Sequence, residues 1–222
     1  MRLVAVADTH TFEAELAPVP DGDVFIHAGD LLRRGTIEEL PAVLDWIRRL
    51  PHAVKLVVAG NHDWCFVDRR EEALRLFGQD ITYLQDEGTE IEGLRFWGSP
   101  WQPEYNGWAF NLPRGRPLDE RWALIPEETD ILITHGPPQG FGDRAGMAER
   151  AGCEDLLRRV RRVRPALHLF GHIHQDGGLW RDDGLCFANV TTWECGRAAT
   201  VIDVDPSTRN VTGVQVPAAR AG

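Results

Sequence analysis

Residues 54–63, VKLVVAGNHD, join a short apolar run to a dense polar cluster. A short run rich in valine predicts a buried strand, because strands favour β-branched side chains. Gly60 predicts a tight turn at the end of the run, and Asn61, His62 and Asp63 follow this glycine directly. The stretch therefore predicts a strand whose carboxyl end carries polar side chains, and the same arrangement recurs along the chain.

Apolar runs of the same character alternate with segments whose apolar residues have helical spacing. The other predicted buried strands are 3–7, 24–27, 131–134 and 167–170. The predicted helices are 36–50, 68–77 and 154–163, the first with Thr36 as its N-cap in spite of Pro41. Later runs at 81–84, 90–97, 185–190, 199–204 and 211–216 are separated by turn residues, as antiparallel strands are. This alternation predicts an α/β fold.

Length and composition indicate the general class of protein. A chain of 222 residues, 43% of them hydrophobic, can bury a full core, so we expect a single domain over residues 1–222. The four cysteines have no C-x-x-C spacing, which argues against a disulfide framework or a zinc knuckle. The sequence has no basic leader with a cleavage site, and its apolar runs are far below the roughly 20 residues of a spanning helix. We therefore expect a cytoplasmic protein without a membrane segment.

The net charge of −10 bears on the partners of the protein. Proteins that bind long nucleic acids normally present a basic face that displaces counterions. The acidic balance therefore favours a small substrate over a polymer. Whether the chain forms a homodimer stays open at this point.

Polar clusters follow each of the five predicted buried strands. They are Asp8-Thr9-His10, Gly29-Asp30, Gly60-Asn61-His62-Asp63, His135-Gly136 and Gly171-His172-Ile173-His174. The loops at the carboxyl ends of strands in α/β sheets converge on one rim, so we expect these clusters to form one site. Five of the eight histidines lie in the clusters, and we expect the other three, His27, His52 and His168, to be structural.

The residue types of the clusters point to metal ions. Carboxylate oxygens, imidazole nitrogens and an amide oxygen suit manganese, iron, zinc or magnesium, and the clusters contain no thiolate for a softer metal. In the D-x-H and H-x-H spacings, an extended backbone directs both side chains to the same face, where they can reach one metal or two adjacent ones. The sequence therefore predicts a metal centre at this rim.

The order of these motifs resembles the signature of calcineurin-like metallophosphoesterases. The segments 98–115 (GSPWQPEYNGWAFNLPRG) and 133–138 (ITHGPP) are similar to a small metallophosphodiesterase subfamily, which is related to vertebrate brain metallophosphodiesterases and bacterial cyclic-nucleotide phosphodiesterases. The resemblance extends over residues 3–203. It implies a four-layer α/β/β/α sandwich, in which two mixed sheets are flanked by helices.

The resemblance also implies roles for single residues. It assigns Asp8, His10 and His174 to a first metal, Asn61, His135 and His172 to a second, and Asp30 to a bridge between the two. His62 would lie beside the scissile phosphate, and Asp63 would orient it. The common family motif G-D-x-x-D-R reads GDLLRR at residues 29–34, so its second acidic residue is missing. Subfamilies that hydrolyse monoesters with the help of that residue fit this chain less well.

The predicted function depends on two bound divalent or trivalent cations. Manganese is the expected metal, and iron or zinc are the alternatives. Two cations about 3.5 to 4 Å apart can deprotonate a shared water near neutral pH and hold the phosphoryl oxygens for in-line attack. We expect hydrolysis of small phosphodiesters, with cyclic nucleotides as candidates. A phosphomonoesterase or nuclease on the same metals, or a non-catalytic metal-binding scaffold, are the alternatives.

The segment 97–110 is rich in aromatic residues. An aromatic wall beside the metals could stack on a nucleobase, and Trp101 and Tyr105 are the predicted substrate contacts. The alternative is an ordered loop whose tryptophans complete the core or a dimer contact.

Overall fold

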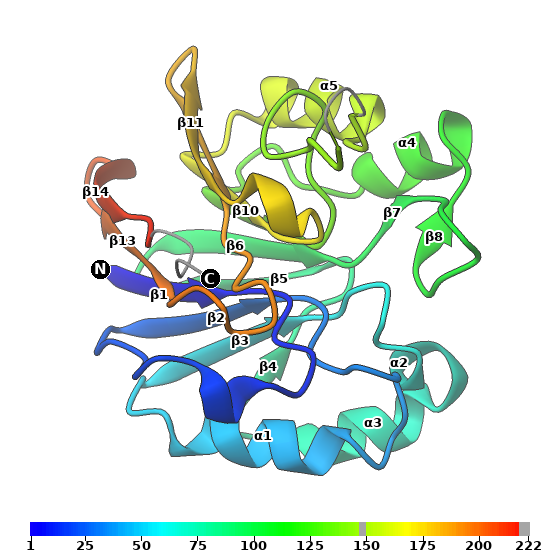
Figure 1. Ribbon diagram of the computed structural model, residues 1–222. Coiled ribbons are helices and arrows are strands. Elements are labelled where there is room, and N and C mark those ends of the chain that lie inside the picture. Colours follow the sequence, from blue (N-terminus) through cyan, green and yellow to red (C-terminus); the bar gives the residue numbers. More distant parts are fainter. Residues whose placement is uncertain (147–149, 218–222) are drawn as a thin grey trace.

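Two six-stranded sheets pack face to face in the computed structural model, which describes residues 1–146 and 150–217 (Figure 1). The first sheet has the order β14-β13-β1-β2-β3-β4 and comprises β1 (Arg2–Val6), β2 (Val24–Ala28), β3 (Val54–Val58), β4 (Thr82–Tyr83), β13 (Thr200–Asp205) and β14 (Asn210–Gln215). The second has the order β11-β12-β10-β9-β6-β5 and comprises β5 (Glu87–Ile91), β6 (Leu94–Ser99), β9 (Ile131–Thr134), β10 (Leu167–Phe170), β11 (Gly178–Asp182) and β12 (Leu185–Asn189). Strands β7 (Gln102–Pro103) and β8 (Asn111–Leu112) pair separately.

Helices cover the outer face of each sheet, as Figure 1 shows. Helices α1 (Leu40–Arg49), α2 (Cys65–Asp68) and α3 (Arg70–Phe77) pack on the first sheet, and α4 (Arg116–Trp122) and α5 (Glu154–Val163) pack on the second. Two short 3₁₀ helices, η1 (Glu13–Glu15) and η2 (His174–Asp176), complete the elements. One apolar cluster lies between each sheet and the helices on its outer face, and another lies between the two sheets. The predicted α/β/β/α sandwich of two mixed sheets is therefore confirmed.

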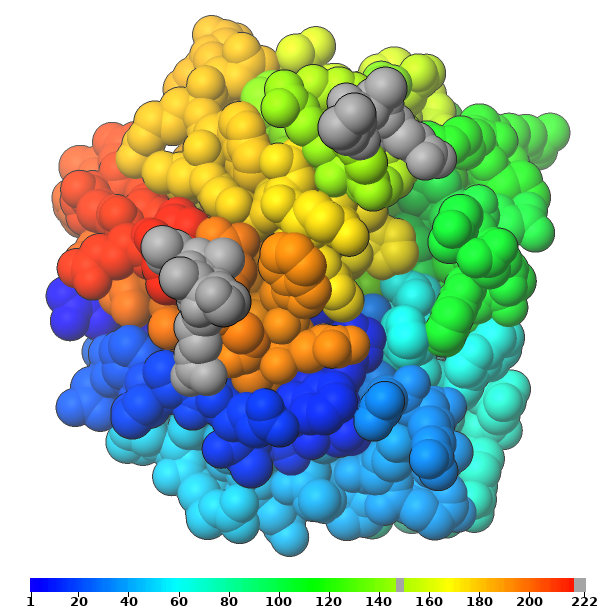
Figure 2. Space-filling view, viewed as in Figure 1, coloured from blue at the N-terminus to red at the C-terminus, as the bar shows by residue number. Residues whose placement is uncertain are grey.

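The parallel strands of both sheets end at the same rim. In the first sheet β1 to β4 are parallel, and in the second β6, β9, β10 and β12 are parallel. A hydrogen bond connects the two sheets at this rim. The backbone N–H of Ala7, which follows β1, donates to the carbonyl of Val190, which follows β12, across 3.1 Å. In the space-filling view the part of the chain coloured orange lies between the blue and the yellow parts (Figure 2).

Several predicted elements differ from the observed ones for local reasons. The predicted strand 90–97 is a hairpin, because Glu92 and Gly93 adopt φ of 49° and 80° and turn the chain between β5 and β6. The predicted helix 36–50 starts only at Leu40, where Pro41 fits the first turn. The predicted helix 68–77 is observed as α3 from Arg70 onward, because the φ of −132° at Arg69 separates it from the short helix α2 that ends at Asp68.

The later strands do not form one antiparallel run as predicted. Strand β4 joins the first sheet in parallel to β3, and β12 joins the second sheet in parallel to β10. Strands β13 and β14 form the expected antiparallel pair, and β5 and β6 are antiparallel within their hairpin. Helix α4 and strand β11 were not predicted from the sequence. Within the described ranges, no helix is long and apolar enough to cross a membrane.

His27 and His168 lie inside strands, as predicted, and each approaches a threonine. Nε2 of His27 is 3.0 Å from the hydroxyl of Thr9, and Nε2 of His168 is 2.8 Å from the hydroxyl of Thr134. Burial lowers the pKa of both histidines to about 3. Both rings are therefore neutral at physiological pH.

Acid should destabilise the protein partly through His168. In the unfolded chain His168 has a pKa near 6.5, whereas burial lowers its pKa in the folded protein to about 3. Wild-type stability should therefore fall through this window by about 1.4 kcal/mol per pH unit relative to His168→Asn. Urea unfolding of both proteins at about pH 7 and about pH 5 checks this. The two proteins differ only at residue 168, so a difference in unfolding free energy between them that is the same at both pH values would contradict the assignment.

Candidate metal centre

The predicted metal ligands lie in loops that follow five parallel strands. Asp8 and His10 follow β1, Asp30 follows β2, Asn61 follows β3, His135 follows β9, and His172 and His174 follow β10. These loops converge from both sheets, and the backbone N–H of Gly171 donates to the carbonyl of His135 across 2.9 Å. The structure thus brings all seven predicted ligands to one rim.

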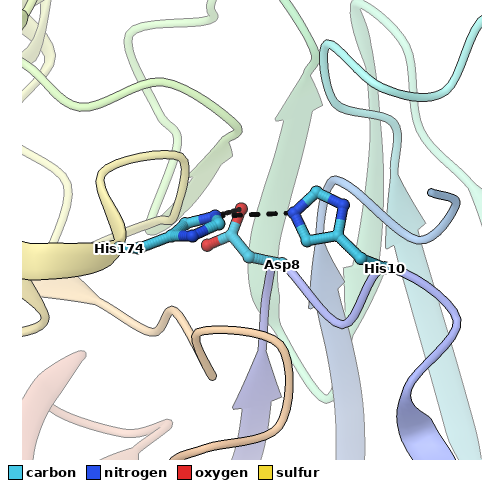
Figure 3. A group of neighbouring side chains, drawn as sticks. All are labelled: Asp8, His10 and His174. Atoms are coloured by element: carbon cyan, nitrogen blue, oxygen red, sulfur yellow. Dashed lines mark hydrogen bonds and ion pairs between the residues drawn. The ribbon is translucent and has the colours of Figure 1, made fainter. Parts of the chain in front are cut away.

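Asp8, His10 and His174 form a first group, and their side chains point toward one another (Figure 3). Nε2 of His174 is 3.7 Å from a carboxylate oxygen of Asp8 and 3.4 Å from Nε2 of His10. Ligand atoms of the group all lie within 4.8 Å of one another, which is close enough for one cation. The first predicted ligand set is therefore assembled in space.

Asp30, His135 and His172 form a second group beside the first. Oδ1 of Asp30 is 3.3 Å from Nε2 of His135, whereas Oδ2 is 3.7 Å from Nε2 of His10 in the first group. The amide oxygen of Asn61 is 2.9 Å from Nε2 of His135. One carboxylate oxygen of Asp30 thus faces each group.

Four of these residues have backbone conformations that L-amino acids rarely adopt. Asp8, His10, Asp30 and His172 have φ of 58°, 48°, 56° and 70°. Such a conformation costs on the order of 1–2 kcal/mol per residue and persists only where the surrounding structure enforces it. Here the backbone N–H of Asp8 donates to the carbonyl of Gly29, and that of His10 to the carbonyl of Asp30. Strain of this kind clusters at functional sites.

Two glycines allow the loops to approach the ligands closely. A Cβ atom on Gly60 would lie 2.2 Å from Oδ1 of Asp30, and one on Gly29 would lie 2.3 Å from Nδ1 of His135. Gly29 also has a φ of 101°, which a side chain would disfavour. The tight turn predicted at Gly60 is confirmed, because the backbone N–H of Asp63 donates to the carbonyl of Gly60 across 3.1 Å.

Buried opposite charges dominate the electrostatics of the centre. Burial raises the pKa of the Asp30 carboxyl, but the neighbouring His135 outweighs burial and holds this pKa well below its usual range. Burial lowers the pKa of His135, but Asp30 raises it to about 9. Burial lowers the pKa of His172 to about 4, so this ring offers a lone pair at neutral pH.

The donors fit hard or borderline cations. Carboxylates, imidazoles and one amide are the ligands that manganese, zinc and iron accept. Without a cation, a proton on His135 balances the Asp30 carboxylate. A bound cation would take over this role and release the proton.

His62 and Asp63 lie beside the two groups, but they do not pair as predicted. Nδ1 of His62 is 3.1 Å from the carbonyl oxygen of Arg33. The buried Asp63 carboxylate instead accepts hydrogen bonds from the backbone N–H groups of Gly60 at 2.7 Å and Leu32 at 2.9 Å. Asp63 therefore holds together the loops that carry Asn61 and Asp30, and the carbonyl of Arg33 orients His62.

The two predicted substrate contacts differ in their surroundings. The indole N–H of Trp101 donates to Asp86 across 2.8 Å, and the guanidinium of Arg121 lies 4.5 Å from its ring centroid. Trp101 is therefore held by Asp86 and Arg121, and its contact with substrate stays a prediction. Tyr105 is 64% exposed and lines a cavity of about 380 Å³ that His172 also borders.

Sequence reasoning missed the contact between Trp108 and His62. Their ring centroids lie 4.1 Å apart at an interplanar angle of 32°. Trp108 lies in the aromatic segment 97–110, but the irregular spacing of that segment gives no indication of which ring faces the centre.

Several known proteins have sequences similar to this chain. Metallophosphoesterase domain-containing protein 1 of Homo sapiens is 42% identical over 216 residues, and the match covers 86% of this chain but 65% of that protein. UPF0046 protein K07C11.7 of Caenorhabditis elegans is 41% identical over 203 residues, with 86% of this chain and 69% of that protein covered. The chain thus spans about two thirds of the length of these relatives.

A solved structure and a family profile also match this chain. TT1561 of Thermus thermophilus has a similar fold, with a TM-score of 0.64 at 14% identity over 97% of this chain and 98% of that one. A sequence profile of the calcineurin-like phosphoesterases matches residues 1–176. The chain therefore belongs to the calcineurin-like phosphoesterase family, whose members are metal-dependent hydrolases of phosphoesters.

Proposed function

We propose that this protein hydrolyses small phosphodiesters at a centre of two cations, with manganese as the first candidate. The supporting observation is the position of Asp30, whose two carboxylate oxygens face different ligand groups. In the proposed centre, Asp8, His10 and His174 would hold one cation, Asn61, His135 and His172 would hold the other, and Asp30 would serve both. Two cations in such a centre lower the pKa of a shared water and withdraw negative charge from the phosphoryl group.

His62 is the proposed general acid. Its Nδ1 faces the carbonyl of Arg33, which leaves Nε2 as the ring atom for proton transfer. A protonated His62 would give this proton to the departing alkoxide, a step that typically contributes 10² to 10⁴ in rate. Asp63 would act indirectly, because its carboxylate fixes the loops around Asp30 and Asn61.

The cavity beside the centre suits one alcohol group of a small diester. Tyr105, Pro103 and Ile173 supply apolar surface, and Gln175 supplies a side-chain amide. A volume of about 380 Å³ is in the range of small-molecule sites. The net charge of −10 favours such a substrate over a long nucleic acid.

Hydrolysis of paired aryl esters tests the proposed reaction. The protein loaded with manganese should cleave an aryl phosphodiester faster than the matching aryl phosphomonoester. Proteins loaded with zinc and with iron, assayed in parallel, show which cation supports turnover best. Faster cleavage of the monoester would contradict the diester preference, and cleavage of neither ester by any loaded form would favour a binding scaffold.

A further inference from the structure

We infer that Trp108 is a positioning residue for His62, because its indole holds the imidazole in the orientation that proton transfer needs. This inference rests on the proposed function and adds a residue to it. A ring separation of 4.1 Å is direct van der Waals contact, and the tilt of 32° is close to an offset stack. Such a contact restricts rotation of the imidazole about its side-chain bonds.

The surroundings of His62 show why this contact matters. Nδ1 of the imidazole is 3.1 Å from the carbonyl of Arg33, and the ring of His10 meets it edge-on with centroids 4.5 Å apart. The neighbouring Asp63 is engaged with backbone N–H groups and does not brace the ring. His62 is only partly buried, so one hydrogen bond alone would leave its partly exposed side free to move. Trp108 adds a contact with the face of the ring to the hydrogen bond at Nδ1 and the edge contact with His10.

Trp108 is itself tied to the loop that carries His62. The backbone N–H of Ala109 donates to the carbonyl of Asn61 across 3.1 Å, directly before His62 in the chain. The carbonyl of Ala109 accepts from the side-chain amides of Gln102 at 2.9 Å and Asn111 at 3.1 Å. Gln102 is almost fully buried, at 1% exposure, and anchors the segment in the fold. The backbone next to Trp108 is therefore held against the loop that carries His62, and this places the indole beside the imidazole.

A positioning role predicts a selective kinetic defect. Trp108→Leu should lower kcat on the order of five- to tenfold, the value of one aromatic contact, while KM and metal content change little. Trp108→Phe should retain most of the activity, because a flat ring still covers the imidazole. Trp46→Leu removes an indole of helix α1 that packs on Phe25 of strand β2, and it controls for general loss of stability.

A double-mutant cycle separates positioning from direct substrate contact. If Trp108 acts through His62, then Trp108→Leu should have no further effect on kcat in a His62→Ala background. A full additional defect in that background would mean that the indole contacts substrate or metal, and it would overturn the inference.

An NMR measurement tests the same contact without turnover. In zinc-loaded protein labelled with ¹⁵N-histidine, the His62 ring signals are assigned by their loss in His62→Ala. Trp108→Leu should shift the His62 carbon-bound protons downfield through loss of the indole ring current, and Trp108→Phe should shift them less. Unchanged His62 signals in Trp108→Leu would overturn the inference. If the wild type cleaves neither ester, the proposed function fails, and the NMR comparison alone decides whether Trp108 holds His62.

Discussion

Replacing Asp30 by asparagine should reduce the bound cations below two per chain and lower diester turnover on the order of 10³-fold or more. The two oxygens of Asp30 face His135 at 3.3 Å and His10 at 3.7 Å. Asparagine keeps one oxygen and removes the charge, so it can serve at most one group. A lost cation removes several kcal/mol of transition-state stabilisation, which corresponds to this loss of rate.

Asparagine is also the conformationally appropriate substitution. Asp30 has a φ of 56°, which asparagine tolerates better than alanine does. Asp30→Ala therefore adds backbone strain to the loss of the ligand. Metal content by elemental analysis and diester turnover check both variants, with Asp80→Asn at an exposed surface carboxylate as the control. Two cations per chain in Asp30→Ala would contradict the bridging role.

His62→Ala should lower turnover by a factor on the order of 10² or more and leave the metal content near the wild-type value. KM should change less, because proton donation acts in the transition state. The metal content is informative because a ring nitrogen of His62 lies within 4.8 Å of ligand atoms of both His10 and Asp30. These three side chains are close enough to hold a cation themselves. If His62→Ala lost one cation, His62 would be a ligand and the assignment of Asn61 would be wrong.

The leaving group decides whether His62 acts as an acid. A nitrophenolate departs without much protonation, whereas a ribose alkoxide has a high pKa and needs a proton. His62→Ala should therefore be more defective on a cyclic nucleotide than on a nitrophenyl diester. Equal defects on the two substrates would exclude proton donation and leave only charge stabilisation by His62.

The sequence predicted the features of the fold that depend on local patterns. Apolar runs that end in polar clusters located the strands at 131–134 and 167–170 without error, and the apolar spacing of 154–163 located helix α5. Errors arose where one residue overrides the pattern. Glu92 and Gly93 turn an apparently continuous strand into a hairpin, and Pro41 moves the start of helix α1.

The candidate site could be predicted only in its residue types and order. Convergence of the strand ends brings Asp30 and His135 into one ligand group and Asp8 into the neighbouring group, as the motifs suggested. The partners of His62 could not be predicted, because adjacency of His62 and Asp63 in sequence says nothing about which backbone groups they meet. The carbonyl of Arg33 and the ring of Trp108 reach His62 from segments that are distant in the chain.

A titration of demetallated protein with manganese tests the central claim most directly. Bound cation, measured by elemental analysis, is compared with the rate of aryl diester hydrolysis at each step. The account predicts no hydrolysis in the metal-free protein, saturation at two cations per chain and a rate that rises with occupancy of the second site. Full hydrolysis by thoroughly demetallated protein, or a maximal rate at one cation per chain, would contradict it.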